Sequence, residues 1–178
     1  LYSVSPEGRA VIGEHNREGI DHGDGKGDLG ESSHHVMLVQ FAEALARRQY
    51  QDDPDSPVET VESYYELEDG HRLDVVGLDA DGEVALTIEA ERVNNDVAEA
   101  VLTDFDKMAS CDPEDSLWVV TSQADAVRIM EALHEPKTGD PRIDRVYSQT
   151  TPTKDYKLDA PGMTGIHTVA DVQGLLGQ

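Results

Sequence analysis

The chain of 178 residues is long enough to bury one hydrophobic core and carry an appendage. Its 37 acidic and 14 basic residues give a formal net charge of −23. No apolar run approaches the roughly 20 residues that cross a bilayer. Cys111 is the only cysteine, which excludes an internal disulfide and leaves a cysteine zinc site unsupported.

The acidic excess is typical of a folded protein adapted to high salt. Acidic residues recur from Glu7 to Asp171, including in segments with clear apolar periodicity, so disorder is a poor explanation. Near 1 M salt the Debye length falls to ~3 Å, which screens the self-repulsion of such a chain. We therefore expect the salt-rich cytoplasm of an extreme halophile, such as a haloarchaeon or one of its viruses or plasmids. The charge neither indicates nor excludes DNA as a partner.

Residues 1–30 are expected to form an N-terminal appendage and a linker. The segment from Tyr2 to Ile12 resembles the closing strand and last helix of winged-helix regulators, although an ordinary capped helix has the same pattern. The segment from Asp21 to Gly30 is rich in glycine and aspartate, which favours a linker. A cation-binding loop is the alternative, but the alternating ligands and closing Glu of a calcium loop are absent.

An α/β core is expected over residues 31–149, followed by an irregular tail over 150–178 with a last helix at 169–176. The Asp69-Gly70 and Asp81-Gly82 pairs are tight-turn signals, so the strands that they join should be antiparallel. In order, we expect a helix over 34–49, strands over 58–67, 71–78 and 83–93, a helix over 95–109, a strand over 116–121, a helix over 124–133 and a strand over 143–148. The strand over 116–121 is continuously apolar, which predicts a buried parallel strand with Trp118 in the core.

Three acidic residues stand out on the second and third predicted strands. Side chains alternate along a strand, so Glu89 and Glu91 should share a face, and Asp74 should lie opposite them on the neighbouring strand. Three converging carboxylates repel one another unless a divalent cation lies among them. The sequence thus predicts a magnesium or manganese site; chance placement of acids on exposed strand positions is the alternative. The other face of the third strand should carry Val84, Leu86 and Ile88, with Ala85 and Thr87 on the acidic side.

This order of elements, with acids on the second and third strands, resembles the PD-(D/E)XK nuclease superfamily. The resemblance spans about residues 33–122, with an expected extension to 148, and implies an αβββαβ, restriction-endonuclease-like core with a mixed central sheet flanked by helices. By this resemblance Asp74 matches the metal-binding Asp and Glu89 the metal-binding acid, with magnesium as the usual ion. Glu91 stands where the family usually has Lys, and Leu73 where it usually has Pro, which leaves catalysis open.

A lysine that activates water or balances charge is common in this family, and Lys107 is the nearest candidate in the sequence. At ~100° per helical residue, Lys107 lies about 120° from the apolar stripe that runs through Val101. We therefore expect Lys107 on the surface, with a catalytic role as the alternative. His34 and His35 begin the first core helix, where we expect a surface capping role, with the rim of the active site as the alternative.

Three functions follow from these observations. The resemblance implies a magnesium-dependent DNA endonuclease or resolvase-like phosphodiesterase, with DNA as its partner and, by analogy, a homodimer. A nuclease-like DNA-binding or regulatory module without catalysis is the second interpretation, because the Lys expected at position 91 is missing. A protein–protein assembly domain is the third, and it predicts that Asp74 and Glu89 diverge in space.

Overall fold

A computed structural model describes residues 33–92 and 97–177 of the chain. Within these residues, five strands form one mixed sheet in the order β1-β2-β3-β4-β5, with helices on both faces. The expected mixed α/β class is therefore confirmed. The appendage and linker expected over residues 1–30 lie outside the described part of the chain. No helix in the described ranges is long and apolar enough to cross a membrane.

The expected order of helix, three strands, helix and strand is present. Strands β1 to β3 pair antiparallel, and β3, β4 and β5 pair parallel. In chain order the elements are α2 (Ser33–Ala46), the π-helical turn η1 (Arg47–Gln51), β1 (Thr60–Glu66), β2 (Arg72–Leu78), β3 (Val84–Glu91), α3 (Val97–Ser110), β4 (Asp115–Val120), α4 (Gln123–His134), the 3-10 turn η2 (Thr153–Asp155), β5 (Gly165–Thr168) and α5 (Val169–Leu176).

Two tight turns join the three antiparallel strands where the sequence predicted them. Gly70 and Gly82 both have a φ of +83°, a left-handed conformation that glycine adopts without a side-chain clash. The Asp79 carboxylate accepts hydrogen bonds of 2.9 Å from the backbone N–H groups of Asp81 and Glu83, which closes the second turn. These turns place β2 and β3 side by side, so the acids on both strands come together.

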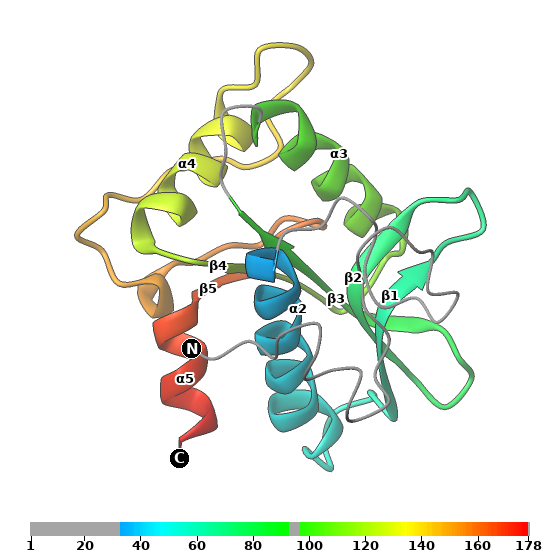
Figure 1. The fold of residues 1–178 in the computed structure, drawn as a ribbon. Helices are drawn as coiled ribbons and strands as arrows, with labels where there is room; N and C mark the ends of the chain where they lie inside the picture. Colours follow the sequence, from blue (N-terminus) through cyan, green and yellow to red (C-terminus); the bar gives the residue numbers. More distant parts are fainter. Residues whose placement is uncertain (1–32, 93–96, 178) are drawn as a thin grey trace, which may run out of the picture.

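The hydrophobic core has two halves, and a pair of helices covers each face of the sheet (Figure 1). Helices α2 and α5 cover one face, where Leu38 packs in the same cluster as Ile88 of β3. Helices α3 and α4 cover the other face, where Met108, Ile129 and Trp118 are fully buried in a second cluster. The core position expected for Trp118 is confirmed. The edge of α3 that faces β2 and β3 overlies the acid-bearing part of the sheet.

A β-bulge on β3 changes the faces expected for its first residues. Gly77 pairs with Leu86 but Leu78 pairs with Val84, so Ala85 is an extra residue on β3. Beyond the bulge Leu86 packs on the α2 face, as expected. Val84 instead packs with the α3 and α4 cluster and Ala85 with the α2 cluster, so their expected faces are wrong. The bulge changes the faces of the residues before Leu86, whereas Glu89 and Glu91, which follow it, still share one face of β3.

The strand expected over residues 143–148 is wrong, and so is the end of the core at residue 149. The place beside β4 is taken by β5, which lies in the tail that was expected to be irregular. Ile143 is buried beside the end of α4, where its carbonyl oxygen lies 3.0 Å from His134 Nδ1. The helix expected at 169–176 is confirmed as α5 and completes the α2 face of the core.

Candidate functional site

An open pocket of about 470 Å³ lies where β2 and β3 meet α2 and α3. All four residues predicted for the site line this pocket. Five carboxylates in the lining face one lysine and one arginine, so its formal charge is −3 with histidine neutral. The lining consists of His35, Glu66, Gly70, Arg72, Asp74, Glu89, Glu91, Asp104 and Lys107.

The side chains of Asp74 and Glu89 are held together by reciprocal contacts between β2 and β3. The Asp74 backbone N–H donates to Glu89 Oε1 at 3.3 Å, and Asp74 Oδ2 accepts from the Ala90 N–H at 2.9 Å. Each carboxylate is therefore oriented by the backbone of the opposite strand. The interpretation as a protein–protein assembly domain predicted that Asp74 and Glu89 point apart, and this is not observed.

Glu89 is the most enclosed acid of the pocket, with 5% of its surface exposed. Burial raises its pKa well above the usual range, and the nearby charge of Asp74 raises it further. Lys107 acts in the opposite direction and favours the ionised form. The ionised form of Glu89 is thus stable in this site only beside a cation, and without one the side chain would take up a proton.

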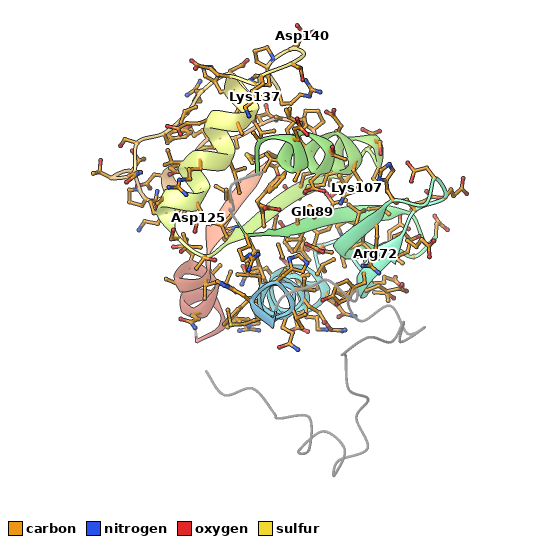
Figure 2. All side chains as sticks on the ribbon, turned by 45° about the horizontal axis from the view of Figure 1, so that its top comes forward. Arg72, Glu89, Lys107, Asp125, Lys137 and Asp140 are labelled. Carbon is orange, nitrogen blue, oxygen red and sulfur yellow. The ribbon has the colours of Figure 1, made fainter. Side chains whose placement is uncertain are left out.

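Lys107 supplies such a cation, and its expected surface position is wrong. Its Nζ lies 2.9 Å from both Glu89 Oε1 and Asp104 Oδ1, and it donates to the Arg72 carbonyl at 2.8 Å. Only 8% of its side chain is exposed. Burial disfavours the ammonium, but the two carboxylates outweigh it and raise the pKa of Lys107. Figure 2 shows Lys107 extending from α3 toward Glu89 on β3.

A helical wheel could not reveal this position because it describes only the direction in which the Cα–Cβ bond leaves the helix. The four-carbon stem of lysine can cover apolar surface while its ammonium reaches a polar site to one side. Asp104 lies three residues before Lys107, on the same side of α3, and completes the pair. Sequence reasoning missed Asp104 as a member of the site, although this spacing was available as a signal.

Glu91 lies in the same pocket but is held less firmly than the other two predicted acids. Its carboxylate makes no hydrogen bond or ion pair with a residue in the described ranges. Burial, followed by the charges of Asp104 and Asp74, raises its pKa to about 7. Glu91 therefore shares the face expected for it and adds negative charge that no side chain in this part of the chain neutralises directly.

The two neighbouring histidines point to different partners. His35 Nε2 lies 3.2 Å from Asp74 Oδ1, which joins α2 to the carboxylate of β2. His34 Nε2 instead lies 3.2 Å from Thr121 Oγ1, beyond the end of β4. His35 thus occupies the rim position that was the alternative to a surface capping role, whereas His34 lies outside the pocket lining.

The donor atoms of the pocket fit a hard divalent cation in chemistry and charge. Carboxylate oxygens are preferred ligands of magnesium and manganese, and the lining has an excess negative charge. In the described ranges, however, no three His, Cys, Asp or Glu side chains are arranged to ligate one ion together. Lys107 already takes one oxygen of Glu89. The three predicted ligands are therefore neighbours without being a preformed ligand set.

Comparisons with protein-family models, with curated proteins and with solved structures found no significant match to this chain. The function of the chain is therefore inferred from its own residues and from the order of its elements.

Proposed function

We propose that this chain is a divalent-metal-dependent phosphodiesterase that acts on DNA. The observation that carries the proposal is the pocket that Asp74, Glu89 and Glu91, on the second and third strands of a helix–three strands–helix–strand core, share with Lys107 of α3. Acids on these two strands, with a lysine beside them, are the residue types that nucleases of the PD-(D/E)XK superfamily use.

Asp74, Glu89 and Glu91 would hold the cation through their carboxylate oxygens. When bound, a magnesium ion in such a site polarises the scissile phosphate and lowers the pKa of an attacking water. Asp74 is oriented for this role before any cation binds, because the Ala90 N–H and His35 fix its two oxygens.

Lys107 would supply the positive charge that the family usually places two residues after the metal-binding acid. Here that position is Glu91, and the ammonium reaches the site from α3 instead. Its contact with Glu89 places a cation beside the carboxylate cluster, where a phosphate oxygen approaching the pocket would otherwise meet only negative charge and Arg72. Lys107 of α3 would thus take the place of the lysine that is missing from β3.

The proposal is tested by incubating the protein with duplex, single-stranded and branched DNA in molar KCl with magnesium. Asp74→Ala should abolish cleavage, and Glu62→Gln, which changes an exposed acid of β1, should leave it unchanged. Cleavage should also stop when the magnesium is chelated. The proposal fails if no substrate is cut, or if Asp74→Ala cuts as well as the wild-type protein.

A catalytically inactive DNA-binding or regulatory module is the second candidate. It is favoured by the ion pairs of Lys107, which partly neutralise Glu89 and Asp104 without a metal. Calorimetric titration with magnesium separates the two candidates. DNA binding without metal uptake supports the inactive module, whereas metal uptake that Glu89→Gln removes supports the enzyme.

A further inference from the structure

A second feature of the molecule is a net-positive segment in an otherwise acidic chain. Residues 137–157 contain five of the fourteen basic residues and only three acidic ones, a net charge of +2 within a chain of −23. The segment connects α4 to the last part of the core. In Figure 2 its first residues, around Lys137 and Asp140, lie beyond the ends of α3 and α4. A polyanion repelled by the rest of the surface would be attracted here.

Part of this segment lines a second open pocket, of about 380 Å³. Arg142, Arg145 and Lys157 contribute three cations to its lining, against the carboxylates of Asp144 and Asp159. Arg142 is committed to a structural role, but Arg145 and Lys157 are exposed and make no ion pair within the described ranges. Two cations, one on each of the two stretches of chain that line the pocket, are thus available to a ligand.

The backbone around Lys157 is held against the stretch that contains Arg145 by contacts of Tyr147. The Tyr147 hydroxyl accepts from the Lys157 N–H at 2.8 Å and lies 3.1 Å from the Lys157 carbonyl oxygen, to which it donates. The rings of Tyr147 and Tyr156 stack with their centroids 4.3 Å apart. Because the backbone is fixed in this way, a ligand would order only the two side chains, which lowers the entropic cost of binding.

The second pocket and the candidate active site are each linked to α3, through Arg142 and Glu89 respectively. Arg142 donates two hydrogen bonds, of 2.8 and 2.7 Å, to the carboxylate of Asp106 on α3. Lys107, which follows Asp106 in the helix, contacts Glu89 instead. Consecutive helical residues point ~100° apart, and a helix with its side chains is about 10–12 Å wide. A polymeric ligand that crosses α3 could therefore contact both pockets, whereas a small anion could occupy only one.

From these observations we infer that the pocket between residues 142–145 and 157–161 binds the sugar–phosphate backbone of a DNA strand, with Arg145 and Lys157 as its phosphate contacts. The choice of DNA as the ligand rests on the proposed function, whereas the presence of Arg145 and Lys157 in the pocket lining does not. The contacts would position the strand across α3 without reading its sequence, because phosphates are the same in every sequence.

The test is the salt dependence of DNA binding by Arg145→Gln/Lys157→Gln. A fluorescent DNA duplex is titrated in EDTA, so that binding is measured without cleavage, and circular dichroism confirms the fold at each salt concentration. Loss of two phosphate contacts should reduce the slope of log K against log salt by about 1.8. The affinity ratio of wild type to variant should then grow about sevenfold as KCl falls from about 1.5 M to about 0.5 M. The matched control Arg48→Gln/Arg128→Gln removes the same charge from exposed positions elsewhere and should keep the wild-type slope.

The outcomes separate this inference from the proposed function. A reduced slope in the pocket variant alone supports the inference, even if the protein never cleaves DNA. A wild-type slope in the pocket variant overturns it, even if cleavage is observed, and so does an equal loss in the control, which would indicate only a general effect of charge. Absence of DNA binding by the wild-type protein also overturns it, while cleavage is judged separately with magnesium.

Discussion

The buried contact between Lys107 and Glu89 predicts a large loss of stability for Lys107→Met. Methionine keeps much of the stem but removes the ammonium, so Glu89 and Asp104 lose their shared partner. Breaking a buried ion pair by removal of one member costs about 3–5 kcal/mol. Glu89 and Lys107 have 7% and 8% of their side chains exposed, but Asp104 has 20%. We therefore expect the lower end of this range, about 3 kcal/mol near pH 8.

The loss should shrink as the pH falls. Glu89 has a raised pKa, so it takes up a proton in the folded variant more readily than in the unfolded chain. Once it is protonated, it no longer needs the ammonium. Lys107 itself stays charged over this range, because its folded pKa is raised and its stabilising contribution is lost only at still higher pH.

The free energy of unfolding would be measured with urea in about 2 M KCl without divalent ions. The single tryptophan, Trp118, is fully buried and reports the transition by fluorescence. Lys137→Met changes an exposed lysine and serves as the matched control. In a Glu89→Gln background the cost of Lys107→Met should fall by at least about 1 kcal/mol. The reasoning is refuted if Lys107→Met costs no more than the control and Glu89→Gln changes nothing, because Lys107 would then be a solvated surface residue.

Two further predictions concern stability without divalent ions. The pKa of Glu91 is raised from 4.5 to about 7, so its contribution is fully present below pH 4.5 and is lost as the pH rises to 7. Glu91→Gln should therefore remove about 2–3 kcal/mol of the fall in the free energy of unfolding between pH 4.5 and 7. Urea titrations at several pH values measure this fall. An unchanged pH profile in the variant would contradict the burial of Glu91. Gly162→Ala should cost at least about 2 kcal/mol, because its Cβ would lie 2.3 Å from the Phe105 carbonyl oxygen. Gly174→Ala, whose Cβ meets nothing within 4 Å, should instead gain up to about 1 kcal/mol from helix propensity; equal effects at both positions would argue against the packing of α3.

The strands that carry the site could be predicted because their signals are local. Asp69-Gly70 and Asp81-Gly82 specify two turns, and alternation then brings Glu89 and Glu91 to one face of β3. The bulge at Ala85 could not be predicted in the same way. It depends on the register between β2 and β3, which is a property of the pair and not of either sequence.

The last strand was misplaced because residues 143–148 have the composition of a strand, whereas β5 occupies the place beside β4. Residues 143–148 contain β-branched and aromatic residues, but they are fixed elsewhere by the contacts of Ile143 and Tyr147. The segment that pairs is shorter and begins with Gly165, where a Cβ would meet a Leu117 methyl at 2.8 Å. A close approach of this kind follows from tertiary packing, which local propensity does not encode.

The sequence indicated which strands bring Asp74, Glu89 and Glu91 together, but not how the charges around them are arranged. Pocket-lining acids follow from strand parity, whereas the role of Lys107 depends on how α3 lies across the sheet. The same holds for His35, which reaches Asp74 from α2. Contacts between side chains on elements that are distant in sequence were thus the part that one sequence could not supply.

We propose that the pocket between β2, β3 and α3 holds a divalent cation. The most direct measurement is the anomalous density of a crystal of the protein soaked in manganese. We expect a peak bounded by Asp74, Glu89 and Glu91 that is lost in Glu89→Gln crystals. A wild-type crystal without a peak at this position, with Lys107 still paired to Glu89 at a saturating manganese concentration, would contradict it.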